Sequence, residues 1–309
     1  MKRTMWCMVA VSLLFFAGCS NQTTELGLRL KTGEYYYQTM HSVSEIEQSY
    51  MGQRLAMTAR ISGELVFLVT AENSGVYDMD ISYNQLSLEM EMPMGAVTYS
   101  SENPQPDDIM SMLLADISNK TFQITMDQSG KVLSVSGLEQ MWDNAIDRFP
   151  ELDEEQQAQI IAQLEDAYGE EAFIRNLELS TAIYPPSKTS VSKRDRWNVS
   201  FVLGNDIPAT VETEYRLTQV KDDEIVIEGK GVIITPGDRV FPGAEGMRMR
   251  YDLEGSMQSE IRINATTGWV TQATIEQTIS GDVMISDEEV PEEMPIAMSV
   301  TNNISIRGK

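Results

Sequence analysis

The number of methionines is the most unusual feature of the composition: the sequence has 20 among 309 residues. Three clusters have Met-x-Met spacing: Met90-Met92-Met94, Met110-Met112 and Met247-Met249. Alternate residues of a strand share one face, and thioethers gathered there could bind Cu(I). Met110 and Met112 lie in a predicted helix, where residues two apart do not face each other. Because methionine is flexible and polarizable, we expect these side chains to line an apolar core or cavity rather than a copper site.

Carboxylates form four clusters, at residues 107–108, 153–155, 222–224 and 287–293. A glycosidase needs two carboxylates about 5–10 Å apart across a cleft, and nothing in the spacing selects such a pair. His41 is the single histidine, so no second imidazole completes a base relay or a metal site. The sequence also lacks a calcium loop, a Gly-rich phosphate loop and a G-x-S-x-G turn. We therefore expect no catalysis, no cofactor and no metal.

The charge balance argues against another class of function. Asp and Glu total 47 against 23 Lys and Arg, which gives a formal net charge of −24 at pH 7. A surface this acidic repels phosphate backbones, so we expect no nucleic-acid partner. Hydrophobic residues make up 42% of the chain, which is enough for a large globular core.

The N-terminus has the parts of a secretory signal. Basic residues at positions 2 and 3 precede an apolar run at 5–16, which is too short to span a bilayer. Small residues followed by Cys19 resemble a bacterial lipobox, although Phe16 stands where Leu is usual. This resemblance implies cleavage between Gly18 and Cys19 and acylation of Cys19, which would anchor the protein to a membrane. An ordinary cleaved signal with an incidental cysteine is the alternative.

The residue after the predicted lipid site indicates the destination. By resemblance to sorted Gram-negative lipoproteins, Ser20 favours the outer membrane. The polar residues that follow carry no acidic run of the surface-export type, so we expect a periplasm-facing protein. They are polar enough to serve as a short tether.

Strict alternation of apolar and polar residues dominates both halves of the chain. Clear period-two runs lie at 54–61, 77–92, 197–203, 211–217 and 247–254. One polar face per strand is typical of an antiparallel sheet with one side in water, and runs this long favour a large curved sheet. The parity reverses at Asn84-Gln85, which predicts a bulge or a tight turn. The apolar face of the run at 77–92 supplies the candidate ligand-cavity residues: Met79, Tyr83, Leu88, Met90 and Met92.

Helical spacing is confined to the middle of the chain. Apolar residues at 138–149 form an amphipathic stripe that Pro150 ends. Asp153 and Gln156 predict a capping box that begins a second helix, which Gly169 closes. Two further helices are expected, at 170–179 and, after Pro106, at 109–114.

These patterns divide the chain into a lipoprotein signal peptide at 1–18, a tether at 19–25, a first β-rich half at 26–137, a helical block at 138–186 and a second β-rich half at 187–309. The segments 122–132 and 261–270 both read as strand, Gly-containing turn and strand. An internal duplication explains this likeness, and so does the general similarity of Gly-turn hairpins. The predicted fold class is mainly β with a helical insertion (α+β), built on large, curved, half-barrel-like antiparallel sheet.

With these features in view, the chain resembles an uncharacterised family of Gram-negative lipoproteins. The resemblance rests on Leu30-Lys31-Thr32-Gly33-Glu34-Tyr35-Tyr36, the strands at 77–92, the segment 130–138, and Tyr184-Pro185-Pro186 leading to Arg196-Trp197. Arg194-Asp195 departs from the expected Gly-Asp turn. The pattern is also similar in fold to the LolA/LolB-type half-barrels, in which a curved sheet closes over helices and holds acyl chains.

Two functional hypotheses follow. In the first, the protein is a non-catalytic binding module that holds a lipid or other apolar ligand between the concave sheet and the helices. In the second, its own helices fill the sheet, and the protein assembles with envelope partners through an edge strand or a loop.

Overall fold

The computed structural model describes residues 23–105, 107–150, 152–186, 190–193, 195–204, 207–242, 247–286 and 293–309. The predicted signal peptide, its cleavage site at Gly18 and Cys19, and most of the tether lie outside these residues. The last two tether residues form β1 (Thr24–Glu25), which pairs with β8 (Ser190–Val191) in a small separate sheet.

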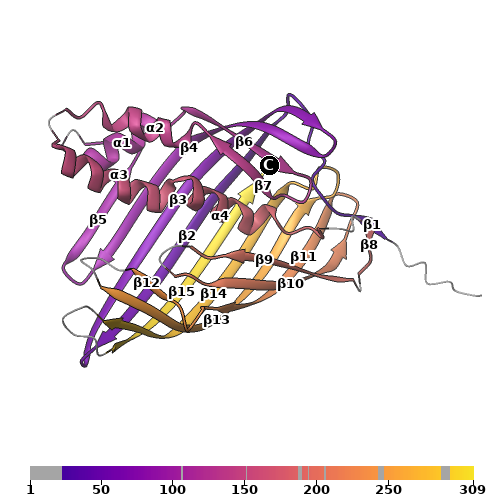
Figure 1. Ribbon diagram of the computed structural model, residues 1–309. Coiled ribbons are helices and arrows are strands. Elements are labelled where there is room, and N and C mark those ends of the chain that lie inside the picture. Colours follow the sequence, from indigo (N-terminus) through magenta and orange to yellow (C-terminus); the bar gives the residue numbers. More distant parts are fainter. Residues whose placement is uncertain are drawn as a thin grey trace, which may run out of the picture.

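The described residues form a 13-stranded antiparallel sheet in which β7-β6-β4-β3-β2-β15-β14-β13-β11-β10-β9 are neighbours in that order (Figure 1). Its strands are β2 (Tyr35–Tyr50), β3 (Gln53–Asn73), β4 (Val76–Met92), β5 (Gly95–Ser100), β6 (Thr121–Asp127), β7 (Val132–Ser136), β9 (Arg196–Val202), β10 (Thr210–Val220), β11 (Glu224–Ile234), β12 (Val240–Pro242), β13 (Arg248–Asn264), β14 (Val270–Ser286) and β15 (Met294–Gly308). β5 pairs with β4, and β12 pairs with β13. Because β2 pairs with β15, the two β-rich halves form one continuous sheet.

The expected irregularity near Asn84 is a β-bulge inside a continuous strand. Glu64 of β3 pairs with Gln85, whereas Leu65 pairs with Tyr83, so Asn84 has no residue opposite it in the register. This extra residue shifts the alternation by one position, so the apolar residues after the bulge point to the same face as those before it. Apolar side chains therefore stay on the same side of the sheet along the whole of β4.

The predicted helices are present, with small differences at their ends. They are α1 (Ile109–Ile117), α2 (Leu138–Ile146), α3 (Glu154–Tyr168) and α4 (Glu170–Thr181). The capping box of Asp153 and Gln156 is confirmed. Gly169 ends α3 and begins α4 in an extended conformation, with φ of −66°, and not in the left-handed region usual for a closing glycine. Among the described residues, no helix combines the length and apolar composition that a bilayer-spanning segment needs.

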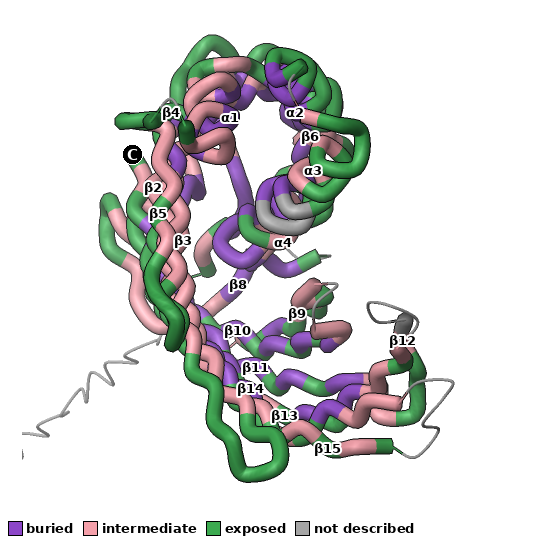
Figure 2. Tube along the Cα trace, turned by 90° about the vertical axis from the view of Figure 1, so that its left-hand side faces the viewer, coloured by how far each residue is buried: buried purple, intermediate pink, exposed green. Residues whose placement is uncertain are grey.

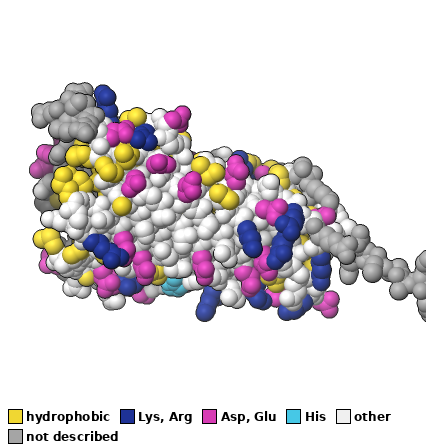
Figure 3. All heavy atoms as spheres, turned by 90° about the horizontal axis from the view of Figure 1, so that it is seen from below, with side chains coloured by type: hydrophobic (Ala, Val, Ile, Leu, Met, Phe, Trp, Pro, Cys, Tyr) yellow, Lys and Arg dark blue, Asp and Glu magenta, His cyan; other side chains and the backbone are white. Residues whose placement is uncertain are grey.

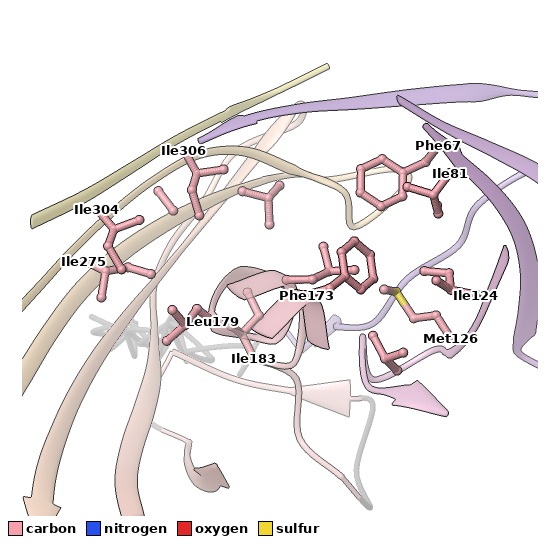
Figure 4. Close-up of a cluster of buried hydrophobic side chains, with 14 of the residues drawn as sticks. Phe67, Ile81, Ile124, Met126, Phe173, Leu179, Ile183, Ile275, Ile304 and Ile306 are labelled. Carbon is pink, nitrogen blue, oxygen red and sulfur yellow. The ribbon is translucent and has the colours of Figure 1, made fainter. Parts of the chain in front are cut away.

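The sheet is strongly curved, and the helices lie on its concave side (Figure 2). The core forms where α4 faces the sheet (Figure 4): Phe173 points toward Phe67, Ile81 and Ile124, while Leu179 and the following Ile183 point toward Ile275 and Ile304. Burial of these side chains fixes α4 against both halves of the sheet. Whether the halves arose by duplication stays a prediction.

Candidate ligand-binding face

The five candidate cavity residues all lie on the concave face of β4, but they fall into two groups. Met79 and Tyr83 are buried in the core, and the ring of Tyr83 lies 5.6 Å from that of Phe122 and 6.5 Å from that of Phe173. Leu88 and Met90 are half-buried, and Met92 is 42% exposed. The structure thus places two of them in packed protein and three on a part of the concave face that the helices do not cover.

The space expected for a ligand beneath the helices is largely filled. A hollow of about 50 Å³ remains between α4 and the sheet, lined by Tyr83, Leu86, Tyr168, Phe173 and Leu177 among others. Sites for small molecules usually enclose several hundred Å³. The position first expected for an apolar ligand, under the helical block, is therefore occupied by aromatic and aliphatic side chains of α3 and α4.

A row of polar side chains crosses the concave face beside this core; we call Ser42, Ser44, Gln277 and Asn302 the polar seam. Asn302 Oδ1 accepts hydrogen bonds from the hydroxyls of Ser42 (2.9 Å) and Ser44 (3.1 Å). Asn302 Nδ2 donates to Gln277 Oε1 at 3.0 Å. The bonds follow the register, in which Ser44, Asn302 and Gln277 lie opposite one another on β2, β15 and β14.

Buried polar side chains also occur on β13 and β10, beyond Gln277 of the polar seam. Gln277 is 2% exposed, and the described structure gives Thr213 Oγ1 and Ser259 Oγ no hydrogen-bond partner. Burying an unpaired polar group costs about 1–3 kcal/mol. A sheet face selected for stability alone would carry apolar residues here.

Arg175 of α4 faces the polar seam across a hollow of about 100 Å³, which Ser42, Gln277 and Asn302 also line. Its side chain is 24% exposed, and its Nη1 lies 3.7 Å from Glu171 Oε2, which is itself 73% exposed. The N–H groups of a partly buried guanidinium can donate hydrogen bonds to an anionic or polar head group.

Beyond the polar seam, the concave face is apolar and only partly covered. We call these side chains the open strip: Ile46, Leu55, Met57, Leu88, Met90, Met92 and Met298. Met57 lies opposite Ile46 of β2, and Ala59, two residues further along the same face of β3, lies opposite Met90 of β4, so the strip crosses β2, β3 and β4. Leu55 is 52% exposed. Three strip residues are among those predicted from sequence: Leu88, Met90 and Met92.

Two larger hollows open at the second half of the sheet. One of about 830 Å³ lies at the ends of β9 to β13, lined by Val202, Ile234, Arg239, Phe241 and Tyr251 among others. Another of about 470 Å³ runs between α4 and the edge strand β9, along residues 198–202. Nothing in the sequence pattern pointed to either hollow, because each is bounded by segments far apart in the chain.

Burial shifts the pKa of titratable side chains on and beside α4. Burial raises the pKa of Glu178, while the N–H of Val132, which donates to its carboxylate at 2.9 Å, lowers it. Burial raises the pKa of Tyr168 to about 12, and its hydroxyl has no hydrogen-bond partner among the described residues. Within the same residues, no three His, Cys, Asp or Glu side chains are grouped to hold a metal ion.

Sequence reasoning missed the polar seam and Arg175, although a signal was present. Gln277 interrupts the apolar face of Ile275 and Ile279, and Asn302 interrupts that of Val300 and Ile304. A polar residue at an apolar position of an otherwise regular strand predicts a buried hydrogen-bond network or a ligand contact.

Comparison with known proteins gives a family but no activity. A family of unknown function, DUF6263, matches residues 74–270. None of the curated proteins compared with this sequence matches it. Among solved structures, an outer membrane channel from Pseudomonas putida F1 is 9% identical, with 91% of this chain and 97% of that chain covered and a TM-score of 0.25.

Two other solved structures are similarly distant. OccK2 of Pseudomonas aeruginosa, in complex with glucuronate, is 6% identical, with 91% of this chain and 99% of that chain covered and a TM-score of 0.20. A DUF1329 family protein from Desulfovibrio piger is 9% identical, with 87% of this chain and 85% of that chain covered and a TM-score of 0.14. Scores this low carry no functional argument.

Proposed function

The chain belongs to the family of unknown function DUF6263, and we propose that it is a lipid-anchored envelope protein that binds an amphipathic lipid on the concave face of its sheet. The acyl part lies along the open strip, and the polar head lies at the polar seam, within reach of Arg175. The protein acts by binding and does not transform the lipid.

One observation carries this proposal: a hydrogen-bonded polar seam borders a half-exposed apolar strip on the same concave face. Asn302 and Met298 stand four residues apart on β15 with the same parity, so the two surfaces adjoin. Each CH2 group that leaves water contributes about 0.8 kcal/mol, so even partial cover of an acyl chain by the strip is favourable. The seam and Arg175 supply the few polar contacts that orient such a ligand.

The anchoring part of the proposal rests on the lipobox-like sequence that ends at Cys19. Acyl chains on Cys19 tether the protein to the outer membrane, and the Ser20 position favours a periplasm-facing orientation. A net charge of −24 keeps the body of the protein from adhering to anionic head groups. The membrane contact is therefore made through the N-terminal lipid.

Native mass spectrometry tests ligand binding directly. The mature chain, residues 19–309 with Cys19→Ser to prevent acylation, is purified from periplasm and weighed before and after lipid extraction. We expect near-stoichiometric acyl species on this protein and their loss in Met57→Gln/Met90→Gln, whereas the matched control Leu133→Gln on β7 retains them. Arg175→Gln weakens retention of lipids with an anionic head more than that of neutral ones. A clean apo mass, or equal lipid in all variants, contradicts the proposal.

The alternative function, an interaction protein without a small ligand, has its own supporting observation. β9 pairs with β10 on one side and forms an edge of the sheet, and five of its seven residues line the hollow of about 470 Å³ beside α4. An edge strand in a groove can receive an extended segment of another chain. Photo-crosslinking from an unnatural amino acid at Ser200, with Leu133 as the control site, tests this alternative.

A further inference from the structure

The end of the sheet that the helices leave uncovered carries a group of exposed apolar side chains. We call them the apolar tip: Tyr50, Met51, Leu55, Met92 and Met94. They lie at or near two hairpin turns, one between β2 and β3 and one between β4 and β5. The two hairpins are neighbours because β3 pairs with β4. Met51 is 82% exposed and Met94 is 100% exposed. In Figure 3 hydrophobic side chains lie at the left-hand end of the molecule, with acidic and basic side chains among them.

Packing within the fold does not account for Met51. Met51 has φ of 49° and Gly52 has φ of 80°, so the two form a hairpin turn with both central residues left-handed. Asn and Gly adopt that conformation readily, whereas a long side chain without polar atoms is strained there. Met51 gains no packing in return, because its side chain is almost fully in solvent. An apolar residue at a position that disfavours it, and that gives it nothing to pack against, indicates a contact outside the chain.

The shape and charge of the apolar tip favour a lipid surface as that contact. Two turns that protrude from the end of a sheet offer little of the broad, flat area, about 800 Å² per partner, that stable protein interfaces use. Unbranched methionines and a tyrosine can instead enter the interfacial layer of a bilayer. The nearest cations are paired: Arg54 with Glu47, and Arg60 with Glu89 (3.4 Å) and Glu91 (3.1 Å). Within the described residues of β3, the tip thus has paired positive charge and suits a zwitterionic surface.

The apolar tip is also continuous with the open strip. Met92 and Leu55 belong to both. The tip lies far from β1, where the described chain begins (Figure 1). β3 has 21 residues and spans about 70 Å, so a short tether on Cys19 does not by itself bring the tip to the anchoring bilayer.

We propose that the apolar tip inserts into a zwitterionic bilayer and forms the mouth through which a lipid enters the open strip. This inference rests on the proposed function for the lipid, while the membrane contact itself is a separate property of the tip. The tip meets a bilayer other than the one that holds the N-terminal anchor, or the same bilayer when the long axis of the molecule lies flat along it. In both arrangements the inserting residues are Met51 and Met94.

The test is co-sedimentation of the mature Cys19→Ser chain with phosphatidylcholine–phosphatidylethanolamine vesicles. We expect measurable partitioning that falls at least ten-fold in Met51→Asn/Met94→Gln, because two apolar side chains no longer leave water. The control Leu133→Gln removes another exposed apolar residue (52%) at a different edge of the sheet and changes partitioning less than two-fold. Asn at position 51 suits the left-handed turn, so the thermal midpoint of Met51→Asn stays equal to that of the parent chain or rises, and a binding loss is not unfolding.

The outcomes separate the two proposals. Equal partitioning of the parent and the double variant overturns the inference, as does absence of partitioning in the parent. A parent chain that is dimeric by light scattering, and monomeric in the double variant, also overturns it, because the tip then binds a second copy. Lipid retained in native mass spectra of a double variant that has lost vesicle binding supports both. An apo parent chain that still binds vesicles through the tip refutes the lipid-binding function alone.

Discussion

The contact between α4 and the β6–β7 turn gives a sharp test of how the helices are fixed over the concave face. Gly130 has φ of +81°, and a Cβ placed there would lie 1.8 Å from the carbonyl oxygen of Thr181. In return, Thr181 Oγ1 donates to the carbonyl of Gly130 at 2.8 Å. Gly130→Ala therefore forces the end of α4 away from the turn.

The expected destabilisation by Gly130→Ala has two parts, and comparison with a substitution at a second glycine separates them. Gly33 has nearly the same φ, +83°, but nothing lies within 4 Å of the position that a methyl group would take there. Gly33→Ala carries only the left-handed strain of an L-residue, about 1–2 kcal/mol. Gly130→Ala carries the same strain and also loses the Thr181 hydrogen bond, about 1 kcal/mol, and part of the packing of α4. We expect a total of about 3–5 kcal/mol for Gly130→Ala.

Urea and thermal unfolding of both variants measure the difference. About 2–4 °C in Tm per kcal/mol predicts a midpoint of Gly130→Ala lower than that of Gly33→Ala by about 5–10 °C. Binding of a hydrophobic dye should also rise in Gly130→Ala, because a displaced α4 uncovers the core. Equal midpoints for the two variants would refute the reasoning, since the close contact would then cost nothing.

Three further changes probe the buried polar groups and the anchor. Burial raises the pKa of Glu178 in the folded state, so the stability that its protonated form contributes is lost as pH rises from its unfolded pKa through its folded pKa. The free energy of unfolding of Glu178→Gln should therefore exceed that of the parent at pH 7 and equal it near pH 3. A difference that stays constant across that range contradicts this. Tyr168→Phe removes a buried hydroxyl without a partner among the described residues and should raise the free energy of unfolding by about 1 kcal/mol in urea titrations, whereas a loss would reveal a partner for that hydroxyl. Cys19→Ser in the full chain should abolish palmitate labelling and release the protein from the membrane fraction, and retention of the label would refute the lipid site.

Much of the local structure could be predicted from the sequence, because strands and helix ends are determined by neighbouring residues. Alternation identified the long strands and the face on which Leu88, Met90 and Met92 lie. The parity reversal located the bulge at Asn84, and the spacing of Asp153 and Gln156 located the start of α3. These features depend on contacts within one element or between adjacent strands, which a linear pattern records.

The positions of the polar seam and the open strip were decided only by tertiary structure. Pairing of β2 with β15 joins residues about 260 positions apart and brings Ser42 to Asn302, an arrangement that no local pattern encodes. Whether the space under the helices is open also depends on how Phe173 of α4 meets Tyr83 and Phe122 of distant strands. Alternation specifies which face of each strand is apolar, but the helices cover only part of the concave face. The part that they leave uncovered is set by the packing of whole elements against one another.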